Sequence, residues 1–186
     1  MKRIAMSCTL LAFFALAACE TSAPAMQVEP WPTSGMGPTP YTAEQIRDAH
    51  PSGTVLRFRM STPAAGEMLQ TMRFVGSDAD GTTVRQRQEQ DGKQLGAETE
   101  QRVGWEDLRK HALFDAEMTT REAATVTVAA GTFDCWLYTV RQVAQPGVVQ
   151  YLYFAHEKPG PPVLMVAKAD GKDVMRMELL EYRRGE

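Results

Sequence analysis

The sequence predicts a mainly β (α+β) fold: a single antiparallel meander sheet of about nine strands, curled into a half-barrel or incomplete barrel, with one or two short helices. Polar and apolar residues alternate with a period of two over much of the chain. The dipeptide Asp-Gly, which favours tight hairpin turns, occurs at 80–81, 91–92 and 170–171. Turns this frequent leave no room for the crossover helices that parallel strands require, so an antiparallel sheet is expected.

The first predicted element is a short helix over residues 43–49. Thr42 and Gln45 have the spacing of a capping box, in which each side chain satisfies a backbone N–H of the other residue. Pro51 disfavours helical geometry in the residue before it, so the helix must end near His50.

Strands follow in the first half of the domain. Leu56, Phe58 and Met60 share one face of a segment whose arginines share the other, which is the pattern of a half-buried strand. The strand over residues 82–90 is rich in glutamine and arginine. It is expected at an edge of the sheet, where polar side chains discourage pairing with other sheets. The strands expected here cover residues 54–60, 68–75, 82–90 and 95–103.

A second helix is predicted between the strands. Trp105, Leu108 and Ala112 fall on a common helical face within residues 105–112. This helix is expected to lie across an open mouth or face of the sheet.

The second half of the chain reads as strands, and several of them are apolar on both faces. On the longest of them, Phe133, Cys135 and Leu137 alternate with Trp136, Tyr138 and Val140. Strands of this kind are covered on both sides and lie in the middle of a structure. The strands expected here cover residues 125–128, 132–143, 148–155, 163–168 and 174–182.

One stretch of the second half resembles a known kind of domain. Residues 126–140, VTVAAGTFDCWLYTV, resemble a hairpin of bacterial envelope domains that are distantly similar to the lipoprotein carriers LolA and LolB. The resemblance extends over residues 53–182 as a pattern, and it implies a half-barrel that in the carriers binds acyl chains. No ligand-binding residue of that family can be matched to a position of this chain.

The N-terminus has the form of an export signal. Lys2 and Arg3 precede an apolar run over residues 4–15, which is shorter than the ~20 residues that a membrane-spanning helix needs. The sequence Leu16-Ala17-Ala18-Cys19 resembles a bacterial lipobox. That resemblance implies cleavage after residue 18 and lipidation of Cys19 with diacylglyceryl and palmitate-type chains, which hold the protein on a membrane.

Three segments are therefore expected: a lipoprotein signal peptide over 1–18, a proline-rich tether over 19–41 and a β-rich globular domain over 42–186. Prolines interrupt any helix in the tether, and Trp31 is expected there at the lipid interface or simply exposed. The lipoprotein family often has Asp after the cysteine when it stays in the inner membrane. Glu20 at this place favours the outer membrane, with the domain facing the periplasm.

Charge and cysteine content argue against nucleic-acid binding, an intramolecular disulfide and a reactive thiol. Removal of residues 1–18 leaves 18 basic and 23 acidic residues, a formal net charge of −5, which makes nucleic acid a poor partner. Cys8 leaves with the signal and Cys19 is acylated, so Cys135 has no partner for an intramolecular disulfide. No His or Lys near Cys135 in sequence lowers its pKa, and a buried inert thiol is expected.

No motif for catalysis, cofactor binding or metal binding is present in the sequence. The three histidines, His50, His111 and His156, have no metal-ligand spacing, and there is no nucleophile elbow and no phosphate-binding glycine loop. His156 is expected in an exposed turn. The chain is therefore expected not to be an enzyme and to use no cofactor.

Methionines are numerous, and two interpretations remain open for them. Thioethers bind Cu(I), and they also fill irregular apolar cores or line pockets for flexible ligands. The second interpretation is favoured because methionine fills apolar cavities without any preference for metal. The methionines on predicted strands are Met60, Met68, Met72, Met165, Met175 and Met177.

These observations predict an envelope lipoprotein that acts as a non-catalytic scaffold or binding module, with its protein partner unidentified. The alternative is a carrier that holds an acyl chain or lipid in the curved sheet, and an enzyme or Cu(I)-binding protein is the least favoured. An enclosed apolar pocket of roughly 300 Å³ or more would favour the carrier.

Overall fold

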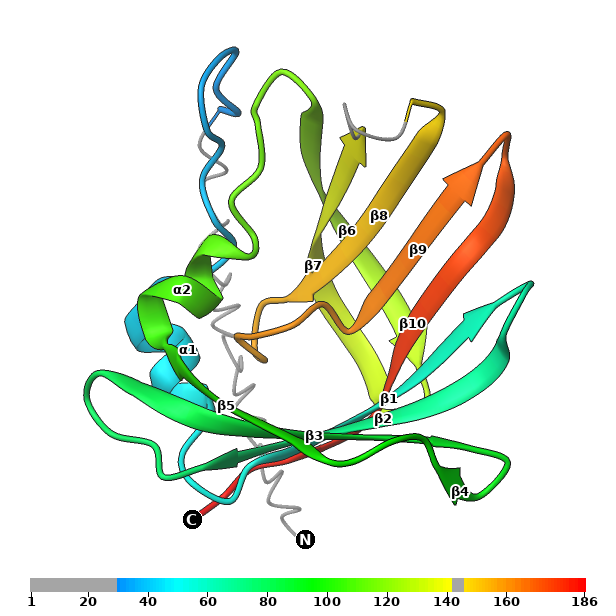
Figure 1. Cartoon of the computed structure of the whole chain (residues 1–186). Coiled ribbons are helices and arrows are strands. Elements are labelled where there is room, and N and C mark those ends of the chain that lie inside the picture. The colour runs from blue at the N-terminus through cyan, green and yellow to red at the C-terminus, as the bar shows by residue number, and fades with distance from the viewer. Residues whose placement is uncertain (1–29, 142–145) are drawn as a thin grey trace, which may run out of the picture. The chain divides into compact units, whose positions relative to one another are not determined.

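The predicted fold class is confirmed. A computed structural model describes residues 30–141 and 146–186, and the body that begins at Trp31 contains one ten-stranded antiparallel sheet and two short helices (Figure 1). The sheet is curled but not closed. The elements are α1 (Ala43–Ala49), β1 (Val55–Thr62), β2 (Gly66–Val75), β3 (Gly81–Gln90), β4 (Lys93–Gln94), β5 (Thr99–Gly104), α2 (Trp105–Lys110), β6 (Thr119–Val128), β7 (Gly131–Arg141), β8 (Val148–Ala155), β9 (Leu164–Ala169) and β10 (Lys172–Arg183).

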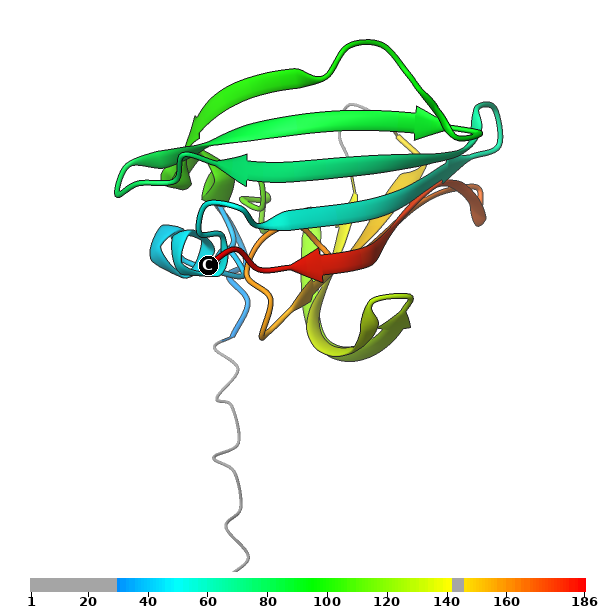
Figure 2. The same cartoon turned by 90° about the horizontal axis from the view of Figure 1, so that it is seen from below.

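The sheet consists of two meanders joined by the first and last strands. Its order is β4-β3-β2-β1-β10-β9-β8-β7-β6, and β5 also pairs with β3. The pairing of β1 with β10 brings the two ends of the domain together, as Figure 2 shows from below.

The expectation that strand 82–90 is an edge was wrong, because β3 pairs with β2 on one side and with β4 and β5 on the other. The polar residues of β3 are explained by the solvent-facing side of the sheet instead. Arg85 and Arg87 lie on the outer face of the sheet, where each forms an ion pair with a glutamate.

Buried side chains lie on both faces of the sheet, and at one end the two helices and the segment before α1 cover the concave face (Figure 1). Ile46 of α1 and Trp105 of α2 are 5% and 4% exposed. They belong to one cluster with side chains from both meanders, which is why the curled sheet holds its shape. The strand residues of that cluster include Leu56, Phe58, Phe74, Val84, Tyr138, Leu152, Phe154 and Leu179.

Helix α1 has the predicted bounds and the predicted cap. The backbone N–H of Gln45 donates to Thr42 Oγ1 at 3.2 Å, and the N–H of Thr42 donates to Gln45 Oε1 at 2.9 Å. Helix α2 ends at Lys110, two residues before the predicted end. The Trp105 indole Nε1 donates to the Asp78 carbonyl at 2.9 Å and anchors α2 beside the loop before β3.

Two of the three Asp-Gly turns have the predicted geometry. The φ angles are 51° and 73° at Asp91 and Gly92, and 49° and 76° at Asp170 and Gly171, as in a type I′ turn. The prediction of a tight turn at Asp80-Gly81 was wrong, because neither residue has a positive φ. The loop there is instead held by the Asp78 carboxylate, which accepts from both backbone N–H groups.

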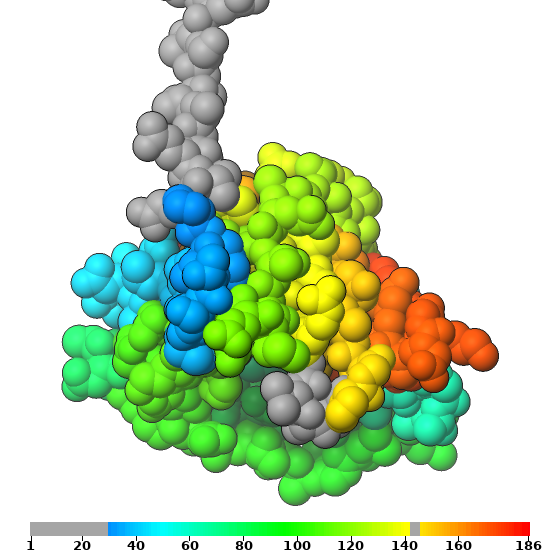
Figure 3. Space-filling view, turned by 90° about the horizontal axis from the view of Figure 1, so that it is seen from above, coloured from blue at the N-terminus to red at the C-terminus, as the bar shows by residue number. Residues whose placement is uncertain are grey.

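The described part of the predicted tether packs on the domain, and this corrects the expectation of an exposed Trp31. The Trp31 indole donates to the Ala116 carbonyl at 3.1 Å, and its ring meets Tyr138 edge-on at 5.5 Å. Figure 3 shows this N-terminal segment lying against the segment that follows α2. The Tyr41 hydroxyl also donates to the Ala155 carbonyl at 2.6 Å. The compact body of the described residues therefore begins at Trp31, inside the segment expected to be a tether.

Candidate functional site

In the described part of the chain, the fold does not bring together the cysteines and histidines that the sequence offered as candidates for chemistry. Cys19 lies outside the described residues. Cys135 is fully buried, and its thiol lies 3.5 Å from the Phe133 carbonyl. Burial, with a smaller contribution from Asp134, raises the pKa of Cys135 to about 11, so the thiol is protonated near neutral pH.

The histidines are also separate. His50 is buried against Phe74, with ring centroids 4.2 Å apart. His156 lies in a turn after β8, as expected, but it is only partly exposed, because its ring packs edge-on against Trp136 at 4.9 Å. In residues 30–141 and 146–186, no group of three or more His, Cys, Asp or Glu side chains is placed to hold a metal ion.

The methionines are the residues that the fold does bring together. Met60 of β1 pairs with Met68 of β2 on one side and with Met177 of β10 on the other. Met177 in turn pairs with Met165 of β9. We call these four residues, which cross four neighbouring strands, the methionine row.

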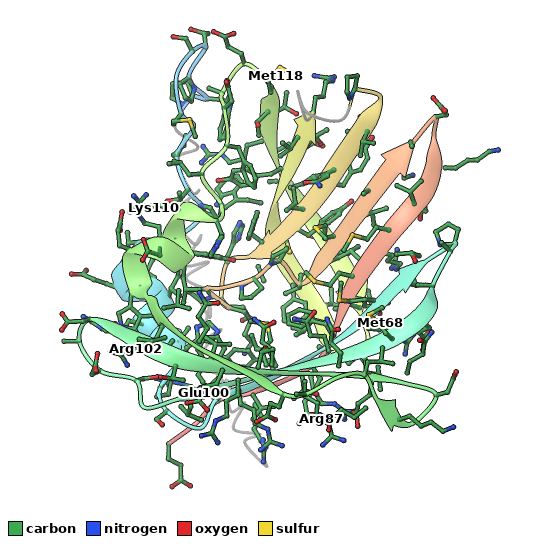
Figure 4. The ribbon with its side chains drawn as sticks, in the orientation of Figure 1. Met68, Arg87, Glu100, Arg102, Lys110 and Met118 are labelled. Atoms are coloured by element: carbon green, nitrogen blue, oxygen red, sulfur yellow. The ribbon has the colours of Figure 1, made fainter. Side chains whose placement is uncertain are left out.

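The methionine row lies on the same face of the sheet as the core residue Phe58, which is two residues from Met60 on β1. Figure 4 shows Met68 on the inner side of the sheet and Arg87 on the opposite side. All four methionines are partly buried, and Met165 and Met177 contact the buried core. The row therefore continues the core outward as a partly exposed apolar surface.

Uncharged polar groups border this row on the concave face. Gln70 pairs across the sheet with Phe58, and its side-chain amide donates to Gln86 Oε1 at 3.3 Å. Gln150 lies on the same face of β8, next to Leu152, which extends the row beyond Met165. Thioethers provide an adaptable apolar surface, and amides can bond to a peptide backbone.

The cavities of the described residues differ from those expected of a lipid carrier. A cavity of about 300 Å³ opens on the outer face among arginines and glutamates. Another, of about 490 Å³, is an open polar hollow beside the end of α1. The cavity next to His50 and Val163 has a mostly apolar lining but holds only about 10 Å³. None of these three described cavities is an enclosed apolar pocket of ligand size.

In the described part of the chain, no helix has the length and apolar character needed to cross a membrane. Comparison with known proteins gives information about the fold alone. No family model matches the chain. No curated protein matches it either.

Two solved structures are similar to the domain. The crystal structure of MucB in complex with MucA(peri) has a TM-score of 0.54 at 12% identity, covering 77% of this chain and 55% of that chain. The complex structure of Pseudomonas aeruginosa MucA/MucB has a TM-score of 0.48 at 15% identity, covering 77% and 56%. The chain thus spans about half the length of the MucB chains that it matches. At 12% identity, the similarity to the first of these structures shows a fold of the same kind.

Proposed function

We propose that this protein is a lipid-anchored envelope lipoprotein whose domain is a non-catalytic binding module for a partner protein. The observation that carries the proposal is the methionine row, a partly exposed apolar surface on the concave face of the sheet. An apolar stripe of a partner segment would pack on the thioethers, with the bordering amides bonding to its backbone.

The fold supports a protein partner over an enclosed lipid. MucB, whose fold is similar, is seen in complex with a second protein, MucA(peri). An acyl-chain carrier needs a pocket that buries most of its ligand, whereas the methionine row is partly exposed and lines none of the three described cavities. Flexible thioethers also suit an acyl chain, so that carrier function is the second candidate.

Site-specific photocrosslinking in cells tests the binding module. A photoreactive residue at Met60 should form a discrete protein adduct, and the same residue at Met36, which is 55% exposed and outside the row, should not. Adding Met177→Lys should abolish the Met60 adduct, because a charge cannot be buried against an apolar partner without a large penalty. Equal adducts at both positions would refute the proposed site.

Native mass spectrometry after gentle extraction separates the two candidates. A bare domain, or one bound to a polypeptide, agrees with the binding module. A lipid retained by the wild-type protein and lost in Met177→Lys would instead establish the carrier.

The anchor has its own test at Cys19. Cys19→Ser should abolish labelling by a palmitate analogue and block cleavage after residue 18, because the serine hydroxyl does not replace the acylated thiol. Cys135→Ser is the matched control and should keep full labelling. Acyl labelling that survives Cys19→Ser would refute the lipoprotein assignment.

A further inference from the structure

The outer face of the same strands carries an unusual concentration of arginine. In one row across the sheet, Val55 of β1 lies between Arg73 of β2 and Arg183 of β10, and Arg73 is directly opposite Arg85 of β3. The next row adds two further arginines. We call the cavity lined by Arg57, Arg73, Arg85, Arg87 and Arg183 the arginine groove; its volume is about 300 Å³.

A β-bulge places Arg183 in this groove. Phe58 pairs with Leu179 and Arg57 with Glu181, so Leu180 is an extra residue on β10. Without it, residues 179, 181 and 183 would all share the concave face, because side chains alternate along a strand. The bulge turns Glu181 and Arg183 to the outer face.

Three of the arginines in the groove already have a carboxylate partner. Arg57 lies 3.7 Å from Glu181, Arg85 lies 2.6 Å from Glu100, and Arg87 is paired with Glu89. Among the described residues, Arg73 and Arg183 have no carboxylate within 4.0 Å. These two exposed guanidinium groups flank Val55, which is 5% exposed and forms an apolar floor.

The arrangement is unfavourable without a counterion. Arg73 and Arg85 are like charges at directly opposite positions of an antiparallel pair, which destabilises a sheet. The groove lining has five arginines against three glutamates, and Glu100 adds one carboxylate at Arg85, so a positive excess remains. The whole chain is acidic, with a net charge of −3, so this excess is local.

We propose that the arginine groove binds a phosphate monoester group, held between Arg73 and Arg183 above Val55. A phosphate monoester carries close to two negative charges at neutral pH and has three acceptor oxygens for two planar guanidinium forks. A carboxylate would balance only one of the two guanidinium charges. The interleaved glutamates disfavour an extended polyanion and so select a single compact group.

Binding of inorganic phosphate to the whole protein tests the site. Calorimetric titration is made against chloride at the same ionic strength, because screening affects any charged surface. Arg73→Gln and Arg183→Gln should each weaken phosphate binding about tenfold or more, since each removes charge-assisted hydrogen bonds. Arg176→Gln is the matched control on the same face of β10; its partner is Glu178 and it lies outside the groove.

Each outcome decides the proposal. Phosphate binding that is lost in the Arg73 and Arg183 variants and kept in Arg176→Gln supports it. Equal weakening in all three variants, or no preference for phosphate over chloride, overturns it.

Two further probes distinguish the source of the phosphate. Glycerol 3-phosphate represents a small soluble ligand, and phosphatidylcholine vesicles containing phosphatidic acid represent a lipid headgroup. Binding of the first alone assigns the groove to a soluble phosphate ester. Vesicle binding that requires Arg73 assigns it to a lipid.

Discussion

The fold changes the acid–base chemistry of His50. It is 1% exposed, its Nδ1–H donates to the Ile46 carbonyl at 2.9 Å, and its Nε2 has no hydrogen-bond partner among the described residues. Burial lowers the pKa of His50 from 6.5 to about 4, so the imidazole is neutral in the folded protein at neutral pH.

Stability should therefore fall with acid through His50. The unfolded chain takes up a proton near pH 6.5 and the folded protein only near pH 4, so the loss develops between these values as the pH falls. The pKa shift corresponds to a loss of about 3 kcal/mol in the free energy of unfolding. Denaturant unfolding of the wild-type protein at pH 7.5, 6, 5 and 4 measures this loss.

The variant His50→Gln should flatten that pH dependence while being less stable at neutral pH, because the packing on Phe74 is lost. The exposed His111 provides the matched control, and His111→Gln should keep the wild-type slope. The same slope in all three proteins would contradict the role given to His50.

At the scale of elements, the cap of α1 is a local device that can be removed alone. Thr42→Ala removes the acceptor of the Gln45 N–H and should lower the free energy of unfolding by about 1 kcal/mol. Thr42→Ser keeps the hydroxyl and should retain most of the stability in the same denaturant titration. A serine variant as unstable as the alanine variant would mean that the methyl group, not the cap, matters.

The segment before α1 is the second element whose contribution can be measured. Trp31 packs on Tyr138, and the Arg121 guanidinium lies over its ring at 5.4 Å from the centroid. Trp31→Ala should cost about 2 kcal/mol, because it removes a large, partly buried aromatic side chain. Trp31→Phe should recover part of this loss by keeping the ring contact. No change in unfolding free energy in Trp31→Ala would show that the segment is held by other contacts.

At the scale of the whole molecule, the domain boundary is a prediction about folding. A chain that starts at residue 31 keeps Trp31, the Tyr138–Pro38 hydrogen bond of 3.0 Å and the buried Tyr41. It should unfold cooperatively at the same temperature as the full-length protein. A chain that starts at residue 42 loses these contacts and should melt at a clearly lower temperature, as measured by circular dichroism. Equal melting temperatures would place the boundary at residue 42 after all.

Local patterns in the sequence predict much of this fold. The alternation at Leu56, Phe58 and Met60 and the capping box at Thr42 depend on neighbours within a few residues, so they are visible in the chain itself. The position of β3 in the sheet was not visible. Polar side chains occur both on edge strands and on solvent-facing surfaces, and only the pairing partners distinguish the two.

The candidate site shows the same division. The sequence by itself determined the lipobox-like motif at Cys19, the antiparallel strands and the presence of many methionines, because each is a matter of composition or short spacing. Only the tertiary structure decided that four of those methionines form one row, since the row depends on the register between β1 and β10 at opposite ends of the domain. It also decided that Arg183 faces outward, because the extra residue Leu180 reverses the alternation that the sequence alone would predict.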